Sequence, residues 1–162
     1  MKKLILLAAL VAGLTRLQAA DEPFFQASLT PDIAVHTKTT ETSGITLSVW
    51  GENPHHGFAF GFVNGSTGDS SGFTWGLVNY DDSYTGVAWG VVNNSKEKFI
   101  GWQSAMVNVA NEFHGLQTGI VNYSENLRGV QIGFFNIAKN NPWFHEFPDK
   151  LATGFPFVNW SF

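Results

Sequence analysis

The chain has 162 residues, enough for one domain with a core of its own and too few for two domains of ordinary size. It contains no cysteine, so it forms neither a disulfide nor a lipid-modified N-terminal cysteine. Its formal net charge of −4 excludes the basic surface expected of a nucleic-acid-binding protein. Charged residues make up 14% and aromatic residues 15%, a balance that argues against disorder and leaves few ionisable groups for an active site.

Residues 1–20, "MKKLILLAALVAGLTRLQAA", are predicted to be a signal peptide. The segment starts with Lys2 and Lys3, continues with an apolar run too short to cross a bilayer as a helix, and ends in small residues before a cut after Ala20. A short N-terminal anchor or a buried helix is the alternative. Without this segment, six basic residues face 13 acidic ones. We therefore expect a protein exported to the periplasm, outer membrane or cell surface of a bacterium.

One eight-residue unit recurs through the middle of the chain. Its copies are "GFAFGFVN" (57–64), "GFTWGLVN" (72–79), "GVAWGVVN" (86–93), "GWQSAMVN" (101–108), "GLQTGIVN" (115–122) and "GVQIGFFN" (129–136). Their first glycines stand 15, 14, 15, 14 and 14 residues apart, a regular period that is typical of a solenoid or other repeat array. The repeat is defined by these glycines and asparagines: Gly57, Asn64, Gly72, Asn79, Gly86, Asn93, Gly101, Asn108, Gly115, Asn122, Gly129 and Asn136.

Each unit has the alternation of a β-strand. In 72–79 the bulky residues Phe73, Trp75 and Leu77 alternate with smaller ones, and the other copies behave in the same way. The linkers are rich in turn-forming and charged residues. Most of them carry one apolar residue two positions before the next glycine, which we expect to be packed; these residues are Tyr84, Phe99, Phe113 and Leu127.

Together these signals predict a single all-β repeat domain over 21–162. The repeats occupy 57–136, a looser copy precedes them at 44–51, an insertion with two prolines follows at 139–153, and a closing strand spans 154–162. No stretch of this domain has the 3.6-residue apolar period of a helix.

Two architectures accommodate such a repeat. In a β-solenoid each period forms one coil, and equivalent residues stack on one another. The bulky face would then point into the coil. The repeated asparagines would form a hydrogen-bonded column at the corner, and Gln103, Gln117 and Gln131 would form a column on the outer face. In a small outer-membrane β-barrel of about 8–10 antiparallel strands, each period would be one strand and one turn, and the aromatic strand ending at Phe162 would close the barrel. The constant period and uniform linkers favour the solenoid.

Four stretches of the chain resemble a known family: the unit G-x-Q-x-G-x-x-N, "TPDIAVH", "WGENP" and the terminal "FPFVNWSF". Over 29–162 the chain resembles the bacterial exported surface-repeat proteins first named from leptospires. The resemblance implies a secreted or envelope-associated protein without an assigned activity. The chain departs from the pattern where Ala59, Thr74 and Ala88 replace the glutamine, and where Ala105 replaces the second glycine.

Histidines and acidic residues offer little for a metal site. His55 and His56 lie near Glu52, but adjacent histidines on a strand point to opposite faces, so we interpret them as a turn-region pair. Asp81 and Asp82 follow Asp69 at a spacing that matches no calcium-binding loop, and we interpret all three as solvated turn acids.

The sequence also offers little for a catalytic site. The chain lacks H-E-x-x-H and G-x-G-x-x-G, so we expect no enzyme activity and no cofactor.

The aromatic residues are the remaining candidates. Trp75 and Trp89 occupy the same place in successive copies, where we expect core or lipid contact rather than a stacking platform for sugars. Trp143 and Phe144 lie in the insertion and are the candidate ligand-binding residues. Our hypothesis is a non-enzymatic exported envelope protein that acts as a scaffold for display or adhesion, with outer-membrane or cell-surface association. The alternatives are an integral outer-membrane barrel and a carbohydrate-binding module.

Overall fold

The computed structural model describes residues 22–162, and the signal peptide predicted at 1–20 lies outside them. Within this range every helix or strand is a β-strand, as predicted. The strands are β1 (Phe25–Thr30), β2 (Ile33–Ala34), β3 (Ile45–Glu52), β4 (His56–Trp75), β5 (Val78–Trp89), β6 (Val92–Ser104), β7 (Val107–Ala138) and β8 (Gly154–Ser161). They form one continuous sheet in the order β2-β1-β3-β4-β5-β6-β7-β8.

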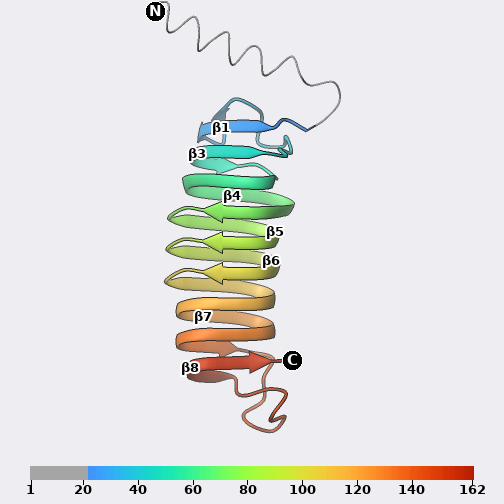
Figure 1. Cartoon of the computed structure of the whole chain (residues 1–162), viewed down its shortest axis with the longest axis vertical. Helices are drawn as coiled ribbons and strands as arrows, with labels where there is room; N and C mark the ends of the chain where they lie inside the picture. Colours follow the sequence, from blue (N-terminus) through green and yellow to red (C-terminus); the bar gives the residue numbers. More distant parts are fainter. Residues whose placement is uncertain (1–21) are drawn as a thin grey trace, which may run out of the picture.

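The sheet winds into a β-solenoid of stacked coils (Figure 1). Strands β3 to β7 pair in parallel, and the repeat copies pair in register: Asn64 with Asn79, Asn79 with Asn93, and Asn93 with Asn108. The long strand β7 runs through successive coils by itself. The solenoid prediction is confirmed and the barrel alternative is wrong, because neighbouring strands of a bacterial barrel are antiparallel whereas these copies lie above one another in the same direction.

The bulky row of each repeat faces outward, which contradicts the orientation that we expected. Trp75 and Leu77 are each 53% exposed, while the alternate residues Thr74 and Asn79 are 3% and 1% exposed. The reason is the narrow interior of a coil. At Gly76 an added Cβ would lie 2.6 Å from the amide nitrogen of Asn64, so the wall beside the asparagine column has no room for a bulky side chain. The equivalent residue in a later coil is only an alanine, Ala105.

The repeated asparagines form the predicted column of hydrogen-bonded amides, placed inside the solenoid. Each Nδ2 donates to the Oδ1 of the asparagine in the next coil at 2.8–3.0 Å, from Asn64 through to Asn136. The same nitrogens also donate to backbone carbonyls, as from Asn79 to Trp89 O at 3.1 Å. The column therefore satisfies its own buried polar groups.

The glutamines form a second internal column, so our placement of Gln103, Gln117 and Gln131 on the outer face is wrong. All three are 0% exposed. Gln117 Nε2 donates to Gln103 Oε1 at 2.9 Å, and Gln131 Nε2 donates to Gln117 Oε1 at 2.8 Å. A long amide fits the interior here because the neighbouring coil supplies its partner.

The apolar linker residues are buried, as predicted. Tyr84, Phe99 and Phe113 stack with ring centroids 5.5 and 5.7 Å apart, and Leu127 extends the same cluster. These side chains form the hydrophobic core of the later coils.

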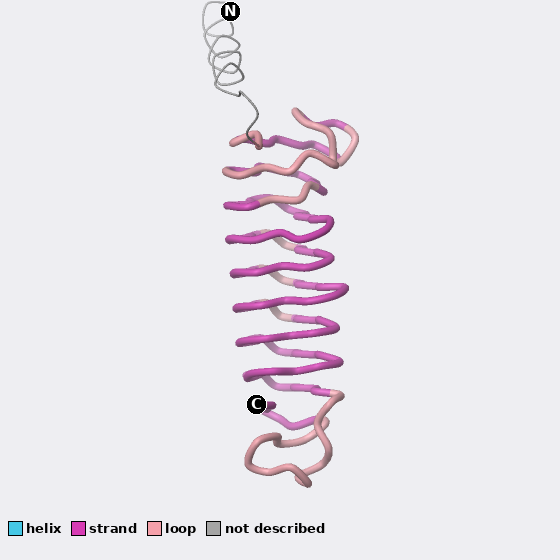
Figure 2. The backbone as a smooth tube through the Cα atoms, turned by 90° about the vertical axis from the view of Figure 1, so that its right-hand side faces the viewer, coloured by secondary structure: helices cyan, strands magenta, loops and turns pink. Residues whose placement is uncertain are grey.

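Both ends of the solenoid are covered (Figure 2). The insertion 139–153 folds below the last coil, and β8 returns antiparallel to β7. Asn136 at the end of the amide column donates to Phe155 O in β8 at 3.1 Å. At the other end the buried Gln26 in β1 donates to Asn53 Oδ1 at 3.0 Å. The end coils therefore pair with covering segments of the same chain.

Candidate functional site: the apolar side of the solenoid

The outward row of the repeats builds a continuous hydrophobic surface, which we call the apolar side. Parallel register places equivalent residues above one another, as in the pairs Trp75 with Trp89 and Val87 with Trp102. The surface consists of four columns: Phe58, Phe73, Val87, Trp102, Leu116 and Val130; Phe60, Trp75, Trp89, Ser104, Thr118 and Ile132; Phe62, Leu77, Val91, Met106, Ile120 and Phe134; and Val63, Val78, Val92, Val107, Val121 and Phe135.

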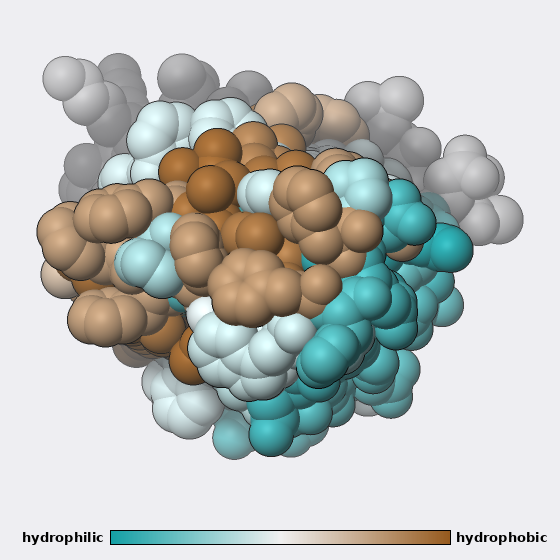
Figure 3. All heavy atoms as spheres, turned by 90° about the horizontal axis from the view of Figure 1, so that it is seen from below, coloured by the Kyte–Doolittle hydropathy of each residue, from teal (hydrophilic) through white to brown (hydrophobic). Residues whose placement is uncertain are grey.

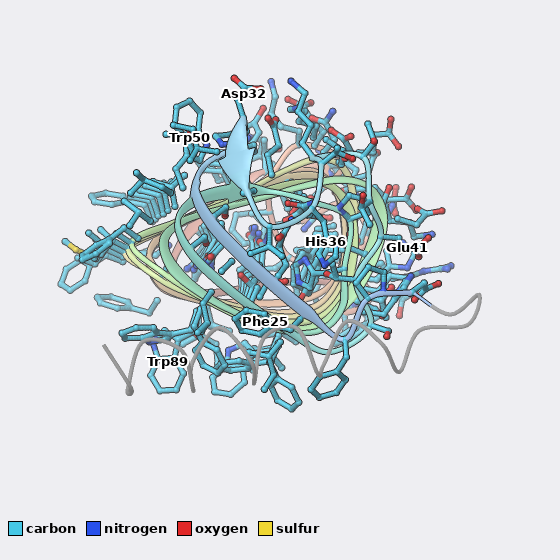
Figure 4. All side chains as sticks on the ribbon, turned by 90° about the horizontal axis from the view of Figure 1, so that it is seen from above. Phe25, Asp32, His36, Glu41, Trp50 and Trp89 are labelled. Atoms are coloured by element: carbon cyan, nitrogen blue, oxygen red, sulfur yellow. The ribbon has the colours of Figure 1, made fainter. Side chains whose placement is uncertain are left out.

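The apolar side bends around a convex ridge. The chain bends at Gly76–Leu77, and the two consecutive residues Leu77 and Val78 both avoid the interior. Two other copies bend at the equivalent place, Gly90–Val91 and Ala105–Met106, and the third and fourth columns lie on either side of the ridge. In the view down the long axis, Trp89 and Trp50 extend from opposite flanks of it (Figure 4). The hydrophobic surface thus covers two flanks and the edge between them.

The linkers form a second, charged part of the exterior. Linker residues at the far corner form ion pairs, from Lys96 to Asp82 at 3.0 Å and from Lys98 to Glu112 at 3.3 Å. The end view shows hydrophobic residues gathered on one side of the molecule and hydrophilic residues on the other (Figure 3). Exposed pairs of this kind add little to stability. Their consequence is that the solenoid is amphipathic about its long axis.

The exposed hydrophobic area is large. Thirteen side chains of the four columns are more than a third exposed. At roughly 80 Å² each, about half of what a large side chain can bury, they present on the order of 1,000 Å² to solvent. A soluble monomer exposes contiguous apolar patches of only a few hundred Å². A surface of this size and continuity indicates an interaction site.

A groove runs along one flank of the ridge. It has a volume of about 460 Å³ and lies between the second and third columns. Its walls are Phe60, Phe62, Trp75, Leu77, Trp89 and Val91, and the backbone of Gly61, Gly76 and Gly90 forms its floor. Shallower hollows continue it in both directions, one beside Leu47 and Val49 and the other beside Met106 and Ile120.

The groove floor has its hydrogen bonds already made. Leu77 N donates to Phe62 O at 2.9 Å, and Gly76 N donates to Trp89 O at 3.1 Å. Val91 N donates to Leu77 O at 3.0 Å. The floor therefore offers these donors to no ligand, and contact in the groove is hydrophobic.

A polar cluster lies inside the early coils. The phenol Oη of Tyr84 lies 3.2 Å from Nε2 of His55, and Asp81 is close enough to influence the Tyr84 pKa. Burial, reinforced by the Asp81 charge, raises the pKa of Tyr84 above its usual range. These three residues are at most 4% exposed. A substrate cannot reach them, so their contribution is to stability.

The acidic linker residues divide between the two faces. Asp82 is outside, where it accepts a hydrogen bond from Gly68 N at 3.0 Å and pairs with Lys96. Asp81 is only 3% exposed, so its interpretation as a solvated turn acid is wrong. The strand alternates through the linker and turns Asp81 inward. His55 and His56 also separate, since His55 is buried and His56 is partly exposed. Among residues 22–162, no three His, Asp or Glu side chains gather as a metal site would require.

The candidate ligand-binding residues Trp143 and Phe144 lie in the insertion below the last coil. They are 55% and 52% exposed. Their rings are 6.0 Å apart and inclined by 52°, and Phe144 meets Phe155 edge-on. Inclined rings do not form the flat platform on which a sugar stacks, and they are separate from the groove.

The sequence predicted neither the groove nor the exposure of the columns beside it. Variation within a column gave no signal, because the buried column changes from Ala88 to Gln103 just as the exposed column changes from Trp89 to Ser104.

These features define a class, the parallel β-solenoid with an amphipathic exterior. Comparison of the chain with protein-family models, curated proteins and solved structures finds no match. Within 22–162 there is no helix long and apolar enough to cross a membrane.

Proposed function

We propose that the protein is an exported, non-enzymatic scaffold of the bacterial cell envelope that lies on a lipid surface along its apolar side. The observation that carries this proposal is the division of the exterior into a continuous hydrophobic side and a charged side. The predicted signal peptide and the resemblance to exported surface-repeat proteins agree with it.

A lipid surface suits this geometry better than a second copy of the chain. The apolar side is convex and extends over both flanks of the ridge, so one flat partner face would cover only one flank. A fluid bilayer closes around a protruding edge. Tryptophan and phenylalanine, which are abundant here, are also the side chains favoured at the membrane interface. The acidic linkers lie at the far corner, where they remain in water.

The test is flotation of the purified protein with zwitterionic phosphatidylcholine vesicles. We expect the wild-type protein to float with the vesicles and to stay bound in high salt, because the attraction is hydrophobic. Replacing the ridge residues Phe62, Leu77 and Val91 together by serine is expected to lower the bound fraction at least tenfold. These side chains point outward, so the strand signal in circular dichroism should be unchanged.

Ile100→Ser is the matched control. Ile100 is 39% exposed but lies in the column that contains Thr85 and His114, away from the ridge. It should float like the wild type. A wild-type protein that stays in solution would overturn the proposal. A stable dimer that the triple serine variant converts to a monomer would also overturn it and would assign the apolar side to a second copy.

A further inference from the structure

The groove beside the ridge has a shape of its own within the apolar side. It runs along the solenoid axis, across the strands, and its walls are repeated in each coil by Phe60 and Phe62, Trp75 and Leu77, and Trp89 and Val91. With the hollows at its ends it extends from Leu47 to Thr118. Coils of a parallel sheet are spaced by about 4.8 Å, so this distance is roughly 24 Å.

We propose that the groove binds a single linear acyl chain, supplied by a free fatty acid or by the tail of a membrane lipid. This inference goes beyond attachment to a surface, because a groove of this kind also holds one acyl chain in water. An acyl tail spans one leaflet, roughly 15 Å or half of the hydrocarbon core, and fits within the groove and its extensions. The volume of about 460 Å³ is also in the range of small-ligand sites.

The chemistry of the groove favours an alkyl chain over a peptide or a sugar. The floor amides already donate within the sheet, so a peptide backbone lying there would bury unpaired polar groups. The one polar side chain in the central groove is Ser48, whose hydroxyl donates to Asn64 Oδ1 at 2.9 Å. An alkyl chain has no polar group to satisfy.

The wall of the groove also determines the direction in which the acyl chain lies. Its second column is aromatic at Phe60, Trp75 and Trp89 and changes to hydroxyl residues at Ser104 and Thr118. Thr118 Oγ1 already accepts a hydrogen bond from Trp102 Nε1 at 2.9 Å, which places polar groups at this end of the groove. The tail is therefore assigned to the aromatic end and the polar head to the end near Ser104.

The experiment uses the tryptophans that line the site as reporters. A fatty acid brominated in its tail, added below its micelle-forming concentration, is expected to quench Trp75 and Trp89 fluorescence with saturation at one chain per protein. The variant with Trp75→Phe and Trp89→Phe keeps the four other tryptophans (Trp50, Trp102, Trp143 and Trp160) and should lose most of the saturable quenching.

Leu77→Glu places a carboxylate in the wall at a position that is 53% exposed, and it should weaken half-saturation at least tenfold. Ile100→Glu, in the column of Thr85 and His114 that does not line the groove, should leave half-saturation unchanged. Equal quenching in all these variants, or quenching that never saturates, would overturn the proposal.

A second experiment distinguishes a free fatty acid from a membrane lipid as the source of the acyl chain. Phosphatidylcholine vesicles with brominated tails replace the free fatty acid. Quenching by both probes supports a site for acyl chains of either origin. Quenching by vesicles alone shows contact with a bilayer and rejects the groove, while flotation remains intact. If the protein binds the free fatty acid but fails to float, the acyl-chain groove is supported and the membrane proposal is rejected.

Discussion

At the scale of the residue, Asn108 shows how buried amides stabilise the interior alongside the hydrophobic core. Its Nδ2 donates to Thr118 O and to Asn122 Oδ1, each at 2.9 Å, and its Oδ1 accepts from Asn93 at 2.9 Å. It is 0% exposed. An amide in this position ties its own coil to both neighbours, so its loss leaves polar groups without partners on either side.

We expect Asn108→Ala to lower the free energy of unfolding by about 3 kcal/mol, because the substitution leaves buried groups unpaired. Urea unfolding followed by circular dichroism measures the change. Asn126→Ala is the control, since Asn126 is exposed in a linker and should cost less than about 0.5 kcal/mol. If the two variants unfold alike, the amide column contributes no special stability.

Asp81 and His55 make the free energy of unfolding depend on pH in opposite directions. Burial raises the pKa of Asp81 to about 7, with the hydrogen bond from Ser95 opposing the shift and the charge of Asp82 adding to it. The unfolded carboxyl has the ordinary pKa of 3.8. The stability from protonated Asp81 is therefore complete below pH 3.8 and is lost as the pH rises through about 7.

His55 acts in the other direction. Burial lowers its pKa to about 4 from 6.5, while the backbone of Asn53 opposes the shift and His56 adds to it. Its contribution is complete above pH 6.5 and is lost as the pH falls through about 4. In the wild type the two effects offset each other across most of this range.

Single substitutions should separate the two groups. At pH 8, Asp81→Asn is expected to raise the free energy of unfolding by up to about 4 kcal/mol, since a buried carboxylate is removed. Between pH 6.5 and 4, its stability should fall on acidification because only His55 remains. His55→Asn should become more stable over the same range. Urea unfolding at four pH values measures both slopes, and slopes of the same sign would contradict the assignment.

At the scale of the element, the coil is the unit of stability. Successive strands pair only with their neighbours in the stack, as in β4 with β5 and β5 with β6. In such an array each coil contributes its own stability and two interfaces. The interior column accepts Ala59, Thr74, Ala88 and Gln103 in turn, so one coil can follow another with small adjustments.

Removal of residues 101–114 tests this unit directly. The deletion joins Ile100 to Gly115 and keeps both the period and the alternation of faces. We expect the shortened protein to fold with the same strand signal and to melt only a few degrees lower. Deleting the seven residues 108–114 is the control, because an odd number moves every following side chain to the opposite face. A short solenoid that fails to fold would contradict the modular picture.

The elements also show how far the sequence could predict the fold. The period, the strands, the buried residues Tyr84, Phe99 and Phe113, and the amide column all follow from spacing and alternation. Alternation assigns residues to two faces without saying which is inside. That choice depends on the width of the coil. The close approach of Gly76 to the side-chain amide of Asn64 shows that the coil is narrow there, and this width is known only from the structure.

At the scale of the whole molecule, the solenoid resembles an amphipathic helix enlarged to many strands. A hydrophobic side extends over the repeats from Phe58 to Phe135 with charged linkers at the far corner, and covered ends limit growth by further stacking. The sequence predicted lipid contact for Trp75 and Trp89 as an alternative to core packing, and core packing is wrong. It did not predict the groove, because the groove forms between two columns of exposed side chains that were expected to be buried.

The two amide columns carry a direction as well as hydrogen bonds. Each asparagine donates toward the C-terminal end, as Asn108 does to Asn122. Two glutamines donate the other way, Gln131 to Gln117 and Gln117 to Gln103. Aligned amides add their dipoles, as the peptides of a helix do. Because the columns point in opposite directions, their fields oppose each other along the axis of the shared coils. In the coils that carry both columns, less charge separation therefore accumulates than at the ends of a helix.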